Sequence, residues 1–119
     1  MSTKATLRFA GRIAIVDLEG RLTLGEGSGL VRSKIKEVVN AGHKHILLNL
    51  QGVNYIDSAG LGELVGSYAT VSNLGGEVKL LNTQAKVRDL LQVTKLYTVF
   101  PSFSDETEAV QSFGTVSAA

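Results

Sequence analysis

Polar and apolar positions follow two different periods along the chain, and the change of period marks where strands give way to helices. Residues 6–9 alternate between polar and apolar side chains, and residues 13–18 form a more continuous apolar run. Gly11 and Arg12 separate these two runs, so the pattern predicts a hairpin with a tight turn. Residues 45–50 form another short apolar run, typical of a strand that is covered on both faces.

Elsewhere, apolar residues recur at helical spacing in four stretches. Gly42 is expected to end the first helix, and the glycines at 75–76 the second. Residues 78–81 fit a further strand, and residues 97–100 fit a short final strand. The four helices are expected to begin near Leu30, at Asp57 or Ser58, after the candidate N-cap Thr83, and after Ser104 or Asp105.

Strands therefore alternate with helices along most of the chain. This order favours an α/β fold in which helices pack on a largely parallel sheet. The length of 119 residues suits one domain. We expect a single small mixed, mostly parallel sheet with an N-terminal hairpin and about four helices, ordered over about residues 5–113, with a frayed tail over residues 114–119.

Composition excludes several classes of protein. Apolar residues make up 44% of the chain, enough for a real core, but no run approaches the ~20 apolar residues of a membrane span. The N-terminus holds no apolar block typical of a secretory signal. The absence of cysteine excludes disulfides and thiolate metal sites, and the net charge of +1 comes with scattered basic residues. We therefore expect a cytoplasmic protein that binds neither nucleic acid nor membrane.

The candidate functional step is the pair Asp57–Ser58, which lies where a loop enters the second predicted helix. Either side chain could cap the helix by accepting a hydrogen bond from a first-turn N–H group. Alternatively, Ser58 is a site of phosphorylation, because a helix N-terminus carries partial positive charge that suits a phosphate. The added dianion beside Asp57 would repel a partner packed on an uncharged surface there.

Catalysis by Ser58 has little support in the sequence. A nucleophile elbow requires glycine two residues before the serine, where this chain has Ile56, and the hydrolase order places histidine after the serine. Here both histidines, His43 and His45, precede it. Their i, i+2 spacing without a third ligand makes a poor metal site. We expect a protein that is not an enzyme and holds no metal.

The glycine-rich segments do not complete a nucleotide-binding motif. Gly25 and Gly27 begin the dinucleotide pattern, but Leu30 stands where a third glycine is required. The segment with Gly60 and Gly62 fails in the same way. We therefore expect no cofactor. The first segment is interpreted as a flexible loop and the second as a close backbone approach at the start of a helix.

The second predicted helix has an unusual surface, since Glu63 is the only charged residue between positions 58 and 75. A solvated helix usually carries charged residues on its outer face, and each interior glycine costs a helix about 1 kcal/mol. Close packing would explain this composition, either against a neighbouring helix of the same domain or against a protein partner. The small uncharged residues are Gly62, Gly66, Ser67, Ala69, Thr70 and Asn73.

Two loops are expected to meet near Ser58. In open sheets of this kind, ligands and partners gather beyond the carboxyl ends of the strands. Residues 51–57 leave the strand of residues 45–50 at that edge, and residues 21–26 leave the preceding strand at the same edge if the two strands are parallel. The sequence therefore predicts that Thr23 lies near Ser58.

Three segments together, VNYIDSAGLGELVG, LGGEVKLLN and VRDLLQVTKLYTVF, resemble the STAS domain of bacterial anti-sigma factor antagonists. The similarity runs from about Leu7 to Phe113. The resemblance implies that a partner anti-sigma factor, an ATP-dependent serine kinase, phosphorylates the serine after the aspartate, here Ser58. It also implies that the bare form binds that kinase and that a serine phosphatase resets the cycle.

Carried over by position, the family pattern assigns a partner-binding surface around Ser58. Ala59 replaces a hydroxyl residue found in many antagonists, and Thr23 lies near the place of a loop acid. We expect a monomer or weak dimer. An alternative is a STAS module of a transport or signalling complex, binding a protein or ligand without phosphorylation. The expected partner-binding residues are Asp57, Ala59, Gly60, Leu61, Gly62, Glu63, Gly66 and Thr23.

Overall fold

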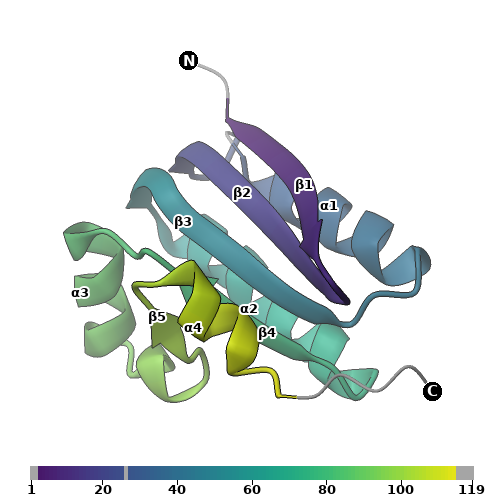
Figure 1. Cartoon of the computed structure of the whole chain (residues 1–119). Coiled ribbons are helices and arrows are strands. Elements are labelled where there is room, and N and C mark those ends of the chain that lie inside the picture. The colour runs from purple at the N-terminus through teal and green to yellow at the C-terminus, as the bar shows by residue number, and fades with distance from the viewer. Residues whose placement is uncertain (1–2, 26, 115–119) are drawn as a thin grey trace.

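The computed structural model describes residues 3–25 and 27–114 and contains one five-stranded sheet in the order β1-β2-β3-β4-β5 (Figure 1). Strands β1 and β2 are antiparallel, and the remaining neighbours are parallel. The strands are β1 (Lys4–Ala10), β2 (Ile13–Leu22), β3 (His45–Ile56), β4 (Glu77–Leu81) and β5 (Ser102–Phe103). The helices are α1 (Ser28–Asn40), α2 (Ser58–Asn73), α3 (Ala85–Val93), α4 (Glu106–Gln111) and the short 3-10 helix η1 (Leu96–Thr98). The expected fold class is confirmed.

The hairpin and the two central strands form as predicted, but β2 and β3 are longer than the apolar runs that indicate them. Gly11 has a φ of 60°, a left-handed conformation that glycine adopts readily, and it lies in the turn between β1 and β2. Beyond Asp17 the pairing of β2 with β3 contains two register irregularities. Such irregularities interrupt the two-residue alternation of side chains, so this part of both strands lacks a clear sequence pattern.

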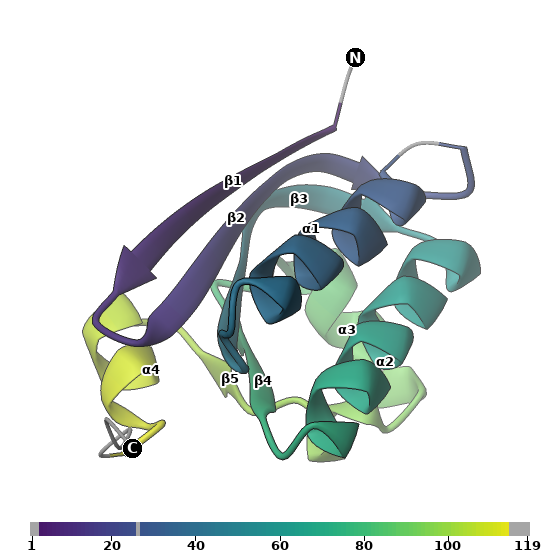
Figure 2. The same ribbon diagram turned by 90° about the vertical axis from the view of Figure 1, so that its right-hand side faces the viewer.

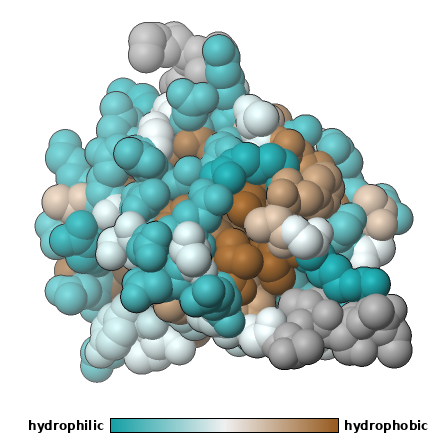
Figure 3. Space-filling model, in the orientation of Figure 1, coloured by the Kyte–Doolittle hydropathy of each residue, from teal (hydrophilic) through white to brown (hydrophobic). Residues whose placement is uncertain are grey.

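The sheet is covered on both faces, which explains why residues 45–50 are almost continuously apolar. Ile46 and Leu48 are fully buried in the larger core cluster, which lies between the sheet and helices α1, α2 and α3. Leu47 is fully buried in a smaller cluster under α4 on the opposite face (Figure 2). Figure 3 looks onto that opposite face and shows apolar side chains gathered near its middle, with hydrophilic residues around them.

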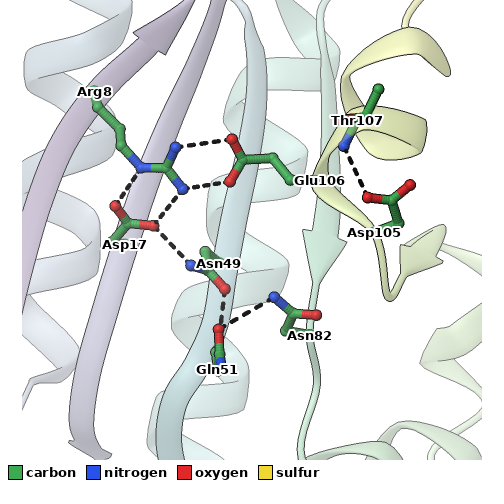
Figure 4. Close-up of polar contacts among 8 residues, drawn as sticks. All are labelled: Arg8, Asp17, Asn49, Gln51, Asn82, Asp105, Glu106 and Thr107. Atoms are coloured by element: carbon green, nitrogen blue, oxygen red, sulfur yellow. Dashed lines mark hydrogen bonds and ion pairs between the residues drawn. The ribbon is translucent and has the colours of Figure 1, made fainter.

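Helix α4 is fastened to the sheet by an ionic network (Figure 4). Arg8 of β1 donates to Asp17 of β2 through Nε at 2.5 Å and to Glu106 of α4 through Nη1 at 2.9 Å. Asn49 of β3 donates to Asp17 at 2.8 Å. The hydrogen bonds from Arg8 lower the pKa of Glu106; partial burial of Asp17 opposes ionisation, but Arg8 and Asn49 outweigh it and lower that pKa also.

The predicted strand over residues 97–100 is wrong. Lys95 takes a left-handed conformation with a φ of 62°, and the chain then forms η1 before entering β5. Phe100, which follows this helical turn, is fully buried, and its ring lies 5.6 Å from that of Tyr68 on α2. Two parallel backbone pairings with β4 then make the final strand.

The expected N-cap of α3 is wrong, whereas one of the two candidate caps of α4 is found. Gln84, not Thr83, occupies the N-cap of α3, and it makes no side-chain capping bond. Asp105 caps α4 by accepting from the N–H of Thr107 at 3.3 Å, so of the two candidate caps there the aspartate is confirmed. Residues 115–119, the greater part of the predicted tail, lie outside the described residues.

Candidate functional site

Asp57 joins three segments of the chain where β3 gives way to α2. Its Oδ1 accepts the N–H of Gly60 at 2.9 Å, which makes it the N-cap of α2. Its Oδ2 accepts the N–H of Leu24 at 3.0 Å, from the loop after β2. Its own N–H donates to the carbonyl of Leu22 at 3.2 Å. One aspartate therefore caps the helix and holds the neighbouring loop against it.

Because Asp57 caps α2, the alternative in which Ser58 is the cap is wrong. Ser58 is the first residue of the helix, and it is exposed. Within residues 3–25 and 27–114, no hydrogen bond to its hydroxyl is found. The side chain is therefore reachable by another protein and is not committed to holding the fold.

The charge next to Ser58 is fixed by the same hydrogen bonds. The backbone N–H groups of Gly60 and Leu24 hold the pKa of Asp57 below its ordinary value. The carboxylate is therefore ionised at neutral pH. A phosphate on Ser58 would meet this negative charge on one side and the partial positive charge of the α2 N-terminus on the other.

The loop that carries Thr23 lies against the start of α2, as the sequence predicts, because Leu22 and Leu24 on either side of it both bond Asp57. Thr23 itself is half-buried and forms a backbone bridge with Gly27. Leu24 was not anticipated as a site residue. Its side chain is 81% exposed, and a leucine within a glycine-rich loop is the only sequence signal that points to it.

Gly60 belongs to the interior of the fold. A Cβ built on it would lie 2.0 Å from the carbonyl oxygen of Leu22 and 2.9 Å from Cγ1 of Ile56. The predicted close backbone approach is confirmed here, since only glycine lets the first turn of α2 come this near to the end of β2. Its neighbours Ala59 and Leu61 are half-buried, and Leu61 packs against the larger core cluster.

The outer face of α2 continues from Ser58 without charge. Positions 58, 62, 65 and 69 lie on one face at helical spacing. Val65 is 37% exposed, and a Cβ built on Gly62 or on Gly66 would meet no atom within 4 Å. A neighbouring helix of the same domain therefore does not account for these two glycines.

Helix α1 packs along the other flank of α2 and leaves a groove of about 320 Å³ between them. Ser67 is buried there, so a neighbouring helix explains its small size. Glu63 crosses the groove to accept from Arg32 of α1 at 3.1 Å, and only 11% of its side chain is exposed. Arg32 of α1 thus neutralises the charge of Glu63, the one charged residue of α2. The groove is lined by Arg32, Ile35, Lys36, Gly62, Glu63, Gly66, Ser67 and Thr70.

The two histidines lie in other parts of the molecule. The ring of His43 lies 4.7 Å from that of Phe9, and Nδ1 of His45 lies 3.6 Å from a carboxylate oxygen of Glu77. Within the described ranges 3–25 and 27–114, no three His, Cys, Asp or Glu side chains are grouped so that they could hold a metal ion. None of the helices in that part of the chain has the length and apolar character needed to cross a membrane.

Comparison with known proteins identifies the family to which this arrangement belongs. Residues 4–109 match the STAS domain family. The chain belongs to the STAS domain family. A relative of this STAS protein is the anti-sigma F factor antagonist of Paenibacillus polymyxa, 30% identical over 106 residues that cover 88% of this chain and 90% of the relative.

Solved structures share the fold of this STAS protein. An anti-sigma factor antagonist from Mycobacterium paratuberculosis matches with a TM-score of 0.84 and 18% identity, over 96% of both chains. The anti-sigma factor antagonist SpoIIAA in its unphosphorylated form matches with a TM-score of 0.79 and 24% identity, over 96% of this chain and 100% of that one. The Bacillus SpoIIAA in its phosphorylated form gives 0.71 and 22%, over 92% and 98%.

Proposed function

We propose that this STAS protein is an anti-sigma factor antagonist switched by phosphorylation of Ser58. The observation that carries the proposal is the placement of Ser58: exposed, free of any capping role, and at the head of an uncharged helix face. The relative from Paenibacillus polymyxa, which bears the name of an anti-sigma F factor antagonist, supports it over most of both chains.

In the unmodified state, the outer face of α2 docks the anti-sigma factor. The lack of a side chain at Gly62 and Gly66 lets another backbone come close, and Arg32 holds the Glu63 carboxylate in the groove. A partner surface can therefore cover the two glycines without burying Glu63 as an unpaired charge, which would otherwise cost several kcal/mol. Capture of the anti-sigma factor frees the sigma factor for transcription.

Phosphorylation converts the same face into one that rejects the partner. The kinase transfers the γ-phosphoryl group of ATP to Ser58 Oγ, ADP departs, and the hydroxyl proton passes to a base of the kinase. The product carries about −1.5 to −2 additional charges at neutral pH. These charges lie beside the ionised Asp57, and the interface would have to desolvate both groups. A serine phosphatase restores the hydroxyl by hydrolysis and releases inorganic phosphate.

In this scheme the protein is a substrate and a binding partner rather than an enzyme. Its partners are an anti-sigma factor serine kinase and a serine phosphatase, and its place of action is the cytoplasm, where sigma factors work. A monomeric or weakly dimeric state stays a prediction. A STAS module that binds without modification would use the same α2 face but would respond differently to the experiment below.

The test is phosphorylation by the purified serine-kinase anti-sigma factors of the source organism. Each kinase is incubated with ATP and the wild-type protein, and intact mass is measured. We expect the mass of one phosphate on the wild type and on the control Ser72→Ala, which removes another exposed serine of α2, and none on Ser58→Ala. If no kinase modifies the wild type, or if Ser58→Ala is modified equally, the switch is rejected.

A further inference from the structure

The loop after β2 presents an apolar side chain at the same end of the molecule as Ser58. Leu22 is fully buried, and two residues later the side chain of Leu24 is 81% exposed. Figure 2 shows this loop and the start of α2 at the same end of the domain. An exposed leucine is ordinary by itself. Here, however, the backbone at that leucine is held in place by a hydrogen bond to a carboxylate.

Asp57 fixes the position of Leu24 relative to Ser58. The Leu24 N–H donates to Oδ2 of Asp57 at 3.0 Å, while Oδ1 of the same carboxylate accepts the N–H of Gly60 at 2.9 Å. Hydrogen bonds to a charged acceptor are about twice as strong as those between neutral groups. The carboxylate therefore couples the loop to the first turn of α2, and Ser58 directly follows Asp57 in that turn.

The loop and the outer face of α2 present apolar side chains and open glycine positions on either side of Ser58, and the charged residues Arg32, Lys36 and Glu63 line the groove along the α1 flank of Gly62 and Gly66. The apolar part consists of Leu24, the exposed Val65 and the open positions of Gly62 and Gly66. The carboxylate of Asp57 already accepts two backbone hydrogen bonds. An occupant matched to the exposed Leu24 side chain offers an apolar pocket.

We propose that Leu24 and the outer face of α2 form one composite docking surface, in which Leu24 inserts into an apolar pocket of the anti-sigma factor and Asp57 is the residue that positions it. The proposal rests on the proposed function, because the occupant is the protein that docks beside Ser58. Asp57 ties the backbone of Leu24 to the first turn of α2, and positioning this residue in advance reduces the conformational entropy lost on binding. This assigns part of the recognition to a loop residue outside α2.

The test compares truncations to alanine of two apolar side chains that are equally exposed. Affinity of the unphosphorylated protein for its purified anti-sigma factor kinase is measured by calorimetry for Leu24→Ala and for Val93→Ala, since Val93 at the end of α3 is also 81% exposed. We expect Leu24→Ala to weaken binding at least about tenfold, the range of interface anchors, and Val93→Ala to leave it unchanged. Leu24→Gln, of similar size but polar, should match Leu24→Ala.

The positioning role has its own readout. In Asp57→Asn one side-chain oxygen can still cap Gly60, but the amide nitrogen that replaces the other oxygen cannot accept from Leu24. Asp57→Asn should therefore weaken binding severalfold in the wild type and have no further effect in Leu24→Ala. If Asp57→Asn lowers the affinity equally in the wild type and in Leu24→Ala, the positioning role of Asp57 is refuted.

The outcomes separate this proposal from the proposed function. The anchor role of Leu24 is refuted if Leu24→Ala binds like the wild type while Ser58→Asp abolishes binding. It is also refuted if Leu24→Ala and Val93→Ala weaken binding equally. In both cases the proposed phosphorylation switch at Ser58 is unaffected. If the wild-type protein binds none of the anti-sigma factors of its source organism, the proposed function fails, and the anchor fails with it. Unchanged thermal unfolding of Leu24→Ala ensures that a loss reflects binding.

Discussion

Two glycines in the first two turns of α2 provide a sharp test of how the site is assembled. Gly60 and Gly62 are two residues apart in one helix, and both would gain helix propensity as alanine, by about 1 kcal/mol. Their surroundings differ completely. A Cβ on Gly62 would have no neighbour within 4 Å, whereas a Cβ on Gly60 would lie 2.0 Å from the carbonyl oxygen of Leu22.

The contact with the carbonyl oxygen of Leu22 sets the size of the stability loss expected for Gly60→Ala. Since real Cβ atoms essentially never come within 3.0 Å of such an atom, Gly60→Ala must push β2 and α2 apart by about 1 Å. Leu22 is fully buried and its carbonyl also accepts the N–H of Asp57, so neither side can move freely. Overpacking of this kind costs about 3 kcal/mol or more, and the gain in propensity leaves a net loss of about 2 kcal/mol.

Urea unfolding followed by circular dichroism measures both variants. Gly62→Ala should be up to about 1 kcal/mol more stable than the wild type, and Gly60→Ala about 2 kcal/mol less stable. The pair should then differ by roughly 10 °C in thermal midpoint for a domain of this size. If Gly60→Ala is as stable as Gly62→Ala, the close approach of α2 to β2 is wrong, and with it the placement of Ser58.

Three further outcomes are expected. Leu64→Ala removes a fully buried side chain between α2 and the sheet, and should lower the free energy of unfolding by about 2–5 kcal/mol in urea titration. Arg8 keeps the folded-state pKa of Glu106 below its ordinary 4.5. The wild type should therefore lose stability as the pH falls from 4.5 through that folded-state pKa. In thermal melts, Glu106→Gln should lose less stability over the same pH range. The free energy of unfolding of Ser58→Asp should lie within about 0.5 kcal/mol of the wild-type value, because an acid at a helix N-terminus is tolerated. The same variant should capture far less anti-sigma factor in a pull-down.

The sequence is a good guide to the elements and a poorer guide to where they end. Periodicity predicts the hairpin, the central strand and all four helices. It does not predict that β3 continues to Ile56, because the register irregularities between β2 and β3 disturb the alternation. That extension decides which residue caps α2: with Ile56 in the strand, Asp57 falls at the N-cap and Ser58 in the first turn.

At the site, the local sequence pattern identifies the candidate polar residues, but contacts between residues far apart in the chain decide how each position is packed. The sequence pattern indicates both polar residues of the Asp57–Ser58 pair as candidates, and the order of the strands predicts that the neighbouring loop lies close to them, as found. The sequence cannot separate Gly60 from Gly62, because their difference lies in the carbonyl of Leu22, nearly forty positions earlier in the chain. For Leu24 it offers only a leucine within a glycine-rich loop, because the attachment of this residue to Asp57 arises when two parallel strands end at one edge.

The most direct measurement of the central claim is the affinity of two purified forms of the same chain for one anti-sigma factor. The bare protein and the form phosphorylated at Ser58 are titrated into the kinase under identical salt and pH. We expect tight binding of the unphosphorylated form. Phosphorylation should lower the affinity at least about a hundredfold, as expected for an uncompensated charge placed in an interface. Equal affinities of the two forms would contradict the phosphorylation switch.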